Sequence, residues 1–292
     1  IKENIDLKKF SEWEADVSGT VKNLYNKKFD QLQNQLLTIP FIRSGNDNRP
    51  YIPGSSIKGA IRTAILNKWS DYIVGEPKDK FKAQNVEAEI LNALYGPDNR
   101  GKYKFDMDRD PFRALKIRDA FLPENSTLFC EVSNFNIDKS GNLHKTGIQI
   151  IAEVTKSALF GDAIEFELEI GIDQKLFDNS ATKLQSRKID IDLLLSSCNR
   201  FYSSVLESER RRLFDRRNAN IASFYNTIKE KAEGGYLLRI GWGSGFESIT
   251  LERFREPKEP RRGKGGWGYS KNLVESKYPL GWMKLELSSG KR

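Results

Sequence analysis

The sequence predicts an α+β protein built from two small modules, each an antiparallel sheet with helices on one face. Long segments have helical periodicity, while short runs rich in β-branched and aromatic residues are separated by turns. Strands and helices do not alternate regularly along the chain, which argues against a doubly wound parallel sheet. We place the boundary between the modules near residue 160. The predicted modules are therefore residues 1–160 and 161–292.

The first module begins with residues 5–37, which lack proline and have the apolar spacing of a helix. A turn-rich segment follows at 44–55. Next comes one apolar stripe at helical spacing, which predicts a buried helix with Ser55 or Ser56 as its N-cap; the stripe consists of Ile57, Ala60, Ile61, Ala64 and Ile65. A further helix is predicted over 85–96, since Gly96 and Pro97 form a typical helix stop.

The remaining elements are short strands and two long helices. Strands are predicted for 114–122, 128–137, 147–155, 163–172, 236–240 and 279–287. Apolar and acidic residues alternate in 163–172, as expected of a half-buried strand. Helices are predicted for 189–214 and 220–235, the second closed by two glycines.

The chain carries 48 basic and 40 acidic residues, a net charge of +8, and its pI is about 9.2. This surplus favours a polyanionic partner such as a nucleic acid. No run approaches the roughly 18 to 20 apolar residues of a membrane span. Two distant cysteines, Cys130 and Cys198, fit a reducing compartment, so we expect a cytoplasmic protein that does not associate with membranes. The single histidine, His144, argues against histidine-based catalysis.

The segment "RPYIPGSSIKGAIRTAIL" (49–66) begins the first strong helix. Gly54 and Gly59 have the spacing of a nucleotide-binding loop, but the required lysine and hydroxyl do not follow Gly59. A helix N-terminus remains, with Lys58 and Arg62 predicted on one side, away from the apolar stripe. Unpaired backbone N–H groups and two cations suit a phosphate. The alternative is a capped amphipathic helix with two solvated charges.

A second candidate is "GWGSG", in which Gly241, Gly243 and Gly245 alternate after a predicted strand. No helix is predicted after it, so the segment lacks the context of a dinucleotide-binding fingerprint. Such a loop could let an RNA backbone or a neighbouring subunit approach closely. The alternative is a tight turn without a ligand.

Three further motifs are less specific. Asp106, Asp108 and Asp110 alternate, but the glycine and glutamate of a calcium loop are missing, which leaves a metal-dependent nuclease site or solvated carboxylates. The arginines of 210–217 suit phosphates or a solvated helix face. The segment "EPRRGKGGWGYSK" (259–271) suits single-stranded RNA or a surface loop.

The segment "FIRSGNDNRPYIPGSSIKGAIRTAIL" (41–66) resembles the signature of the RAMP proteins of type III CRISPR–Cas effector complexes. Four later segments are similar to that superfamily in the same order: "DPFRALKIRDA", "AIEFELEIGI", "LLRIGWGSGF" and "PLGWMKLEL". Together they span residues 39 to 287. Among RAMP families, the first and last of the four most resemble the fifth subunit of the type III-A (Csm) complex.

This resemblance implies two ferredoxin-like (RRM-like) modules and a structural subunit that binds crRNA and caps the 3′-end side of the backbone filament. It implies no catalytic residues, metal or cofactor, and a role in crRNA maturation and antiviral defence. The residues expected at RNA are Gly54, Ser55, Ser56, Lys58, Arg62, Arg113, Gly241, Gly243, Ser244 and Gly245. The expected partners are crRNA, target RNA, the adjacent backbone RAMP subunit, the small subunit and host maturation nucleases. An endoribonuclease of the same fold and a repeated backbone subunit remain alternatives.

Overall fold

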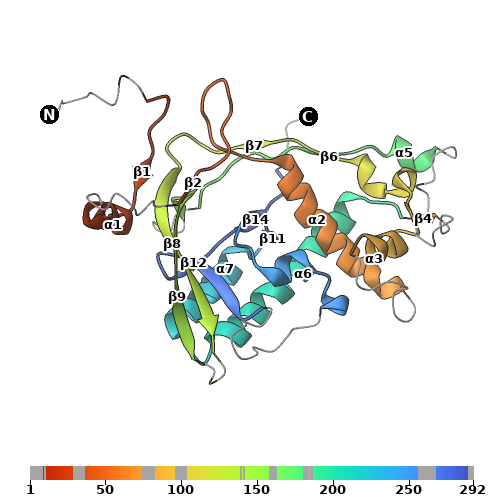
Figure 1. The fold of residues 1–292 in the computed structure, drawn as a ribbon. Helices are drawn as coiled ribbons and strands as arrows, with labels where there is room; N and C mark the ends of the chain where they lie inside the picture. Colours follow the sequence, from red (N-terminus) through yellow and green to blue (C-terminus); the bar gives the residue numbers. More distant parts are fainter. Residues whose placement is uncertain are drawn as a thin grey trace.

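The computed structural model describes residues 9, 11–28, 37–73, 83–95, 104–138, 140, 142–157, 163–179, 184, 187–255 and 268–288. Its main helices are α1 (Gly19–Lys28), α2 (Gly54–Trp69), α3 (Ala83–Ile90), α5 (Lys175–Asp178), α6 (Ile191–Glu209) and α7 (Ala219–Lys231). Short 3-10 helices lie between several of these elements. The structure is α+β, as predicted, and α2 packs against both α6 and α3 (Figure 1).

The largest sheet has six strands in the order β13-β12-β8-β9-β2, with β1 also paired to β8. These strands are β1 (Asp16–Val17), β2 (Thr38–Ile39), β8 (Thr127–Ile137), β9 (Leu143–Thr155), β12 (Ser270–Val274) and β13 (Tyr278–Pro279). The hairpin of β8 and β9 is its centre, and its pairs are antiparallel except β1 with β8 and β2 with β9. The strand predicted at 128–137 is confirmed, and the one predicted at 147–155 begins earlier, at Leu143.

Four two-stranded sheets accompany the large one, and all four are antiparallel. They pair β3 (Tyr51–Ile52) with β7 (Ala120–Phe121), β4 (Leu94–Tyr95) with β5 (Lys104–Phe105), β6 (Leu115–Ile117) with β10 (Ile170–Ile172), and β11 (Tyr236–Arg239) with β14 (Trp282–Leu285). Two of these pairs, β3–β7 and β6–β10, place the chain on either side of the start of α2. They therefore shape the surroundings of that helix terminus.

The main core forms where α2 crosses α6. Ile57, Ile61 and Ile65 of α2 are fully buried, which confirms the predicted stripe; Ala60 is only half-buried. Each buried isoleucine stabilises the fold by about 2 to 3 kcal/mol relative to an exposed one. The Tyr202 hydroxyl of α6 donates to the Ala60 carbonyl at 3.0 Å, so one polar contact also joins the two helices.

The predicted division at residue 160 falls in 158–162, outside the described residues. Strands from both predicted modules share the largest sheet, because β12 pairs along β8 from Ser270 to Val274. The core cluster likewise extends from Ile52 to Leu285. The two halves of the chain are thus joined by a common sheet and a common core, and the boundary stays a prediction.

Several predicted elements differ in the structure: the strand predicted at 114–122 forms the two short strands β6 and β7, and the one predicted at 279–287 forms β13 and β14. Within 5–37 the described helix is only α1, preceded by the short strand β1. The helix predicted to reach Gly96 ends at Ile90, because Asn92 has a positive φ and the chain turns into β4. In 163–172 the predicted alternation of exposure is present, but only β10 pairs with another strand. In 163–172 the alternation of apolar residues predicted which side of the segment faces the core. Its pairing into a sheet depended on β6, which is distant in the sequence.

The long helix predicted at 189–214 is α6 followed by a π-helical turn at Arg210–Phe214. Asp190 caps its start by accepting from the Leu193 N–H at 2.7 Å. Asn218 caps α7 in the same way through the Ile221 N–H. Among the described residues, none of the helices has the length and apolar character needed to cross a bilayer.

Candidate nucleic-acid interface

The N-terminus of α2 is held tightly against β6. A Cβ on Gly54 would lie 2.3 Å from the Ile117 carbonyl oxygen, so only glycine fits there. The Gly54 N–H donates to the Asp119 carboxylate at 2.7 Å. Pro53 is the N-cap and makes no side-chain cap bond, so the prediction that Ser55 or Ser56 caps the helix is wrong. Both serines lie exposed in the first turn instead.

The Lys58 side chain contacts strand β6, which follows α2 in the sequence, and does not extend into solvent. Its Nζ donates to the Leu115 carbonyl of β6 at 2.8 Å, and the side chain is half-buried. Burial lowers the pKa of Lys58 from its usual value, and the nearby positive charge of Lys116 lowers it further. The nearby carboxylate of Asp110 acts on this pKa in the opposite direction.

Arg62 forms ion pairs with two carboxylates, those of Asp110 and Glu87. Its Nη1 lies 2.9 and 3.1 Å from the two oxygens of Asp110, and its Nη2 lies 3.0 Å from Glu87. The guanidinium also stacks over the Phe112 ring, 4.6 Å from the ring centroid. Lys58 and Arg62 are thus not the solvated charges of the alternative interpretation, since Lys58 contacts Leu115 and Arg62 contacts Asp110, 57 and 48 positions further along the chain.

The three alternating aspartates act locally. Asp106 and Asp110 cap two consecutive 3-10 helices, Met107–Arg109 and Pro111–Ala114, through backbone N–H groups. Asp108 is largely exposed and pairs with Arg113 at 2.8 Å. Within the described part of the chain, no group of three or more histidine, cysteine or acidic residues is arranged to hold a metal ion. These carboxylates thus have structural partners.

Five exposed residues lie in the first turn of α2 or in the segment 113–118, whose strand β6 passes Gly54, and we call them the α2–β6 surface: Ser55, Ser56, Arg113, Lys116 and Arg118. Lys116 has no ion-pair partner among the described residues. Arg118 pairs with Glu169 at 2.8 Å, and both side chains are mostly exposed. Exposed pairs of this kind contribute only about 0 to 1 kcal/mol, so a phosphate can compete for the arginine. The surface offers three cations and two hydroxyls beside a helix N-terminus, and the exposed carboxylate of Asp119, which accepts from the Gly54 N–H, opposes an anion there.

Sequence reasoning missed Lys116 and Arg118. The signal was available in "ALKIRDA", because alternate residues of a strand point to the same side and Leu115 is buried. Lys116 therefore had to face outward. What the sequence did not reveal is that β6 lies against the first turn of α2, which brings these cations beside the exposed serines.

The glycine-rich loop follows β11 and has the backbone that its glycines predicted. Gly241, Gly243 and Gly245 have φ values of +81°, +77° and +89°. A Cβ on Gly243 would lie 2.7 Å from the Leu280 side chain. Gly245 begins a 3-10 helix, Phe246–Ile249, although no helix was predicted there. Trp242, at the tip, is 48% exposed and could offer a base a stacking surface.

Ser244 faces inward. It is 5% exposed, and its carbonyl accepts from Lys271 Nζ at 2.9 Å. The side chain expected at RNA is therefore covered by the fold, because the positive φ at Gly243 and Gly245 turns the chain inward between them. The exposed part of this loop is Gly241 and Trp242.

A buried ionic cluster supports the loop from inside. Glu209, at the end of α6, pairs with Arg239 at 2.7 Å and with Lys271, and it accepts from the Tyr225 hydroxyl at 3.0 Å. Burial opposes ionisation of Glu209, but Arg239 and Lys271 together hold its pKa below the usual value. Burial and the repulsion of Arg239 lower the pKa of Lys271 to about 7. The cluster fixes the loop backbone through the Ser244 carbonyl.

The other sequence motifs lie elsewhere. His144 is exposed in the β8–β9 hairpin and lies 2.7 Å from Asp138. Arg210 and Arg211 both bind Glu207, while Arg212 binds Glu247. These arginines therefore have acidic partners. Most of the segment 259–271 lies outside the described residues.

The structure is thus an α+β protein with a basic surface beside the start of α2 and a glycine-rich loop whose backbone contacts a buried ionic cluster. The chain belongs to the RAMP superfamily, whose family model matches residues 35–248. A chain of the cryo-EM structure of a Csm–crRNA–target RNA ternary complex of a type III-A CRISPR–Cas system aligns with a TM-score of 0.63 at 21% identity. That alignment covers 85% of this chain and 75% of the other. The crystal structure of a T. onnurineus Csm5 aligns with a TM-score of 0.56 at 22% identity, over 96% of this chain and 86% of that one.

Two curated proteins show the likeness in sequence. The "CRISPR system Cms protein Csm5" of Methanocaldococcus jannaschii is 28% identical over 213 residues, which is 70% of this chain and 47% of the relative. The chain thus spans about half the length of that relative. The "CRISPR system Cms endoribonuclease Csm3" of Streptococcus thermophilus is 35% identical over 83 residues, 28% of this chain and 31% of the relative. The predicted α+β RAMP architecture is confirmed.

Proposed function

We propose that this chain is a crRNA-binding structural subunit of a type III-A CRISPR interference complex. Its membership of the RAMP superfamily supports the proposal, as does its likeness to a protein named Csm5 across 70% of its length. The observation that carries the proposal is the α2–β6 surface, which places three exposed cations and two serines beside a helix N-terminus. Phosphate oxygens are the ligands that such a surface favours.

The proposed chemistry is recognition of the RNA backbone. Lysine and arginine neutralise phosphates whatever the base, which suits a subunit that must accept any guide sequence. Of the residues predicted at RNA, we assign direct contact to Ser55, Ser56, Arg113 and Gly241, whereas Gly243 packs against Leu280 and shapes the loop. We assign to Gly54, Lys58 and Arg62 the task of holding α2 against β6, because their contacts are internal. Gly245 and Ser244 hold the loop backbone.

We further propose that the subunit caps the 3′-end side of the crRNA filament, with the adjacent backbone RAMP subunit and the small subunit as neighbours. Target RNA and host maturation nucleases are further proposed partners. The similarity to a chain of a Csm–crRNA–target RNA ternary complex supports this assignment. Two modules, divided near residue 160, would give separate surfaces for RNA and for a neighbouring subunit.

We propose a non-catalytic role. The described aspartates of 106–110 act as helix caps or ion-pair partners, and His144 pairs with Asp138 on the surface. A second candidate function, RNA cleavage, is favoured by the likeness of 83 residues to a protein named as an endoribonuclease. Asp108 is the test residue for that candidate, because its side chain is 70% exposed and caps no helix.

RNA binding tests the proposal. Fluorescence anisotropy of labelled crRNA with the purified chain, at several salt concentrations, would give both affinity and salt dependence. Replacing Lys116 and Arg118 with glutamine removes two phosphate contacts, so the slope of log K against log salt should fall by about 1.4, at about 0.7 per phosphate for a single strand. The control is Lys22→Gln with Lys229→Gln, which removes equal charge from exposed positions on α1 and α7. Equal slopes for the two double variants would contradict the assigned surface.

Assembly and cleavage give two further measurements. The native mass of a complex reconstituted with the other Csm subunits should show one copy of this chain, whereas several copies would identify a repeated backbone subunit. Cross-linking should join the chain to the 3′ half of the crRNA rather than to the 5′ half. Incubation with labelled RNA and magnesium should leave the RNA intact. Cleavage that disappears in Asp108→Ala would establish the endoribonuclease instead.

A further inference from the structure

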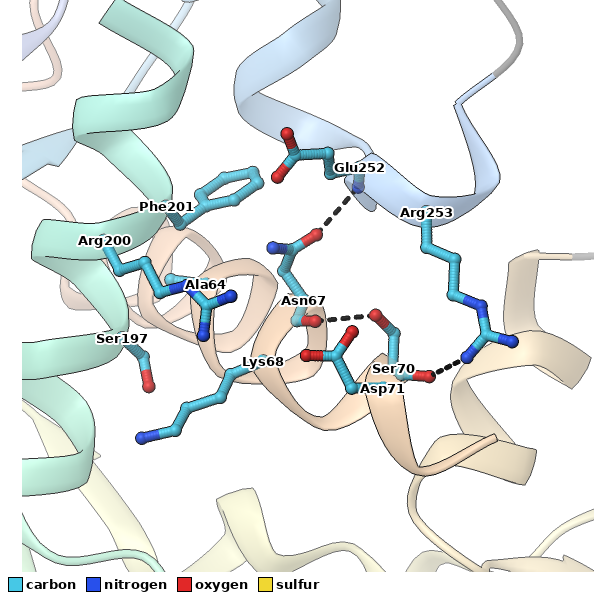
Figure 2. Close-up of a pocket in the computed structure, with 10 residues that line it drawn as sticks. All are labelled: Ala64, Asn67, Lys68, Ser70, Asp71, Ser197, Arg200, Phe201, Glu252 and Arg253. Carbon is cyan, nitrogen blue, oxygen red and sulfur yellow. Dashed lines mark hydrogen bonds between the residues drawn. The ribbon is translucent and has the colours of Figure 1, made fainter. Parts of the chain in front are cut away.

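A polar cavity of about 220 Å³ lies between the C-terminal half of α2, the middle of α6 and the 3-10 helix Glu252–Phe254. Figure 2 shows the side chains that face it. The cavity lies at the opposite end of α2 from the α2–β6 surface. A helix of sixteen residues separates these ends by roughly 20 Å, at about 1.5 Å per residue. The cavity is therefore a separate feature from the proposed RNA surface.

Ser197 is the most informative residue in this cavity. It is 1% exposed, and its hydroxyl has no hydrogen-bond partner among the described residues. Buried polar groups in native proteins are almost always hydrogen-bonded, and leaving one unmade costs about 1 to 3 kcal/mol. Ser197 lines the cavity, so a ligand there could accept its hydrogen bond.

Two cations lie on the same side of the cavity as Ser197. Figure 2 shows the side chains of Lys68, from α2, and Arg200, from α6, directed toward the region of the Ser197 hydroxyl. Neither cation has an ion-pair partner in the described part of the chain. Arg200 is exposed and Lys68 is half-buried, so both cations are available to an anion beside the buried hydroxyl.

Hydrogen bonds hold in place the part of the cavity that lies between these cations and the C-terminus of α2. Asn67 accepts from the Glu252 N–H at 2.7 Å through its Oδ1, so its amide NH₂ is left facing the cavity as a fourth donor. Carbonyl groups at a helix C-terminus are partly negative and would repel an anion. Here Arg253 donates to the carbonyls of Ser70 and Ile73 at 2.7 and 2.6 Å, and so offsets that charge.

We propose that this cavity binds a phosphate group, held by Ser197, Lys68 and Arg200. The donors are one hydroxyl, one ammonium, one guanidinium and one amide, which match the several acceptor oxygens of a phosphate. Asp71 and Glu252 also line the cavity, and Glu252 accepts from Ser204 at 3.2 Å. These carboxylates oppose anion binding and set its affinity. The site extends beyond the proposed function and does not depend on it.

Thermal unfolding of the full chain in inorganic phosphate, at constant ionic strength, tests the site. Native protein should show a saturable rise in Tm with phosphate, since a ligand that binds only the folded state stabilises it. Arg200→Gln should weaken the phosphate affinity about tenfold, the loss of a charge-assisted bond, and Ser197→Ala about threefold. Ser197→Ala should not lower Tm without phosphate, because the hydroxyl it removes has no partner.

Asp71→Asn supplies a control of opposite sign, because removing a carboxylate from the cavity should tighten phosphate binding. Lys229→Gln, on α7, is the matched control for loss of charge and should bind phosphate as the native chain does. An equal phosphate response in all five proteins, or no response in any, would overturn the proposal. If the cavity instead binds an acidic segment of a protein, none of the five proteins should respond to phosphate.

Single-stranded RNA distinguishes two sources of the phosphate. If the group belongs to an RNA strand, Lys68→Gln with Arg200→Gln should lower RNA affinity in addition to the loss from Lys116→Gln with Arg118→Gln. If it belongs to a small molecule, the Lys68 and Arg200 variants should bind RNA normally while losing the response to phosphate. Both outcomes support the site. Failure of the Lys116 and Arg118 variants to affect RNA would count against the proposed function alone.

Discussion

Arg62 of α2 binds both carboxylate oxygens of Asp110, at 2.9 and 3.1 Å, and thereby joins the helix to the segment that leads into β6. The same Asp110 accepts from the Phe112 N–H and caps the following 3-10 helix. One carboxylate thus stabilises a turn and fixes its distance from α2. This pair helps to decide where Lys116 and Arg118 lie relative to the start of the helix.

Arg62→Met should lower the free energy of unfolding by about 2 to 3 kcal/mol, because it removes the cation paired with the mostly buried Asp110 and with the partly exposed Glu87. Asp110→Asn keeps the cap on Phe112 while weakening the pair. Chemical denaturation of both single variants and of the double variant should give a coupling energy of about 1 kcal/mol or more. Losses that simply add would show that the pair does not act as a unit.

Gly54→Ala should destabilise the protein by about 1 to 3 kcal/mol, because its Cβ would overlap the Ile117 carbonyl and force α2 away from β6. Gly59→Ala is the matched control in the same helix. A Cβ there meets no atom of the described residues within 4 Å, so alanine should stabilise the helix by about 0.5 to 1 kcal/mol. Changes of the same sign in the two variants would argue against close packing of the α2 N-terminus.

Ser56→Glu should separate stability from RNA binding. An acidic residue in the first turn of a helix is favourable by about 0.3 to 1 kcal/mol, so Tm should stay constant or rise slightly. The same charge on the α2–β6 surface should repel phosphates and weaken RNA binding several-fold at low salt. Ser223→Glu, at an exposed serine near the start of α7, is the control. Unchanged RNA affinity in Ser56→Glu would remove this turn from the interface.

Lys271 should make stability depend on pH. Its pKa is about 7 in the folded protein, below the roughly 10.4 of an unfolded lysine. Between these values the unfolded chain binds more protons, so this lysine should make the free energy of unfolding rise as pH increases from 7 to about 9.5. The groups that face it are Glu209, Arg239 and Glu247.

Lys271→Met is the comparison for this prediction. The rise in stability between pH 7 and 9.5, measured by chemical denaturation, should be smaller in the variant than in the native protein. Its upper limit for one group is about 1.4 kcal/mol per pH unit. Parallel curves for the two proteins would show that Lys271 keeps an ordinary pKa inside the cluster.

The buried cysteines should be unreactive in the folded protein. Burial raises the pKa of Cys130 and of Cys198 to about 12, so almost no thiolate is present near neutral pH. The thiolate is the reactive form, and reaction with a thiol reagent should therefore require unfolding. Two thiols should react in denaturant and neither in buffer; fast labelling of Cys198 in buffer would contradict the burial of α6.

Local pattern was sufficient for many elements. The apolar stripe of Ile57, Ile61 and Ile65 predicted the buried face of α2, and positive φ at Gly241 and Gly243 agrees with a loop that only glycine forms easily. The segment at 128–137 became β8 because its β-branched and aromatic residues fit a central strand. These features depend on residues a few positions apart, which is why the sequence predicted them.

Local sequence patterns were therefore enough to predict the α+β class, the helix that begins at "PGSS" and the glycine-rich loop. Only the tertiary structure decided that Lys58 and Arg62 have internal partners, that Ser244 is buried, and that Lys116 lies beside the start of α2. The reason is physical: Arg62 and Asp110 are 48 residues apart, and Glu209 and Lys271 are 62 apart. Charges so distant in sequence acquire partners only when packing of the core brings their elements together.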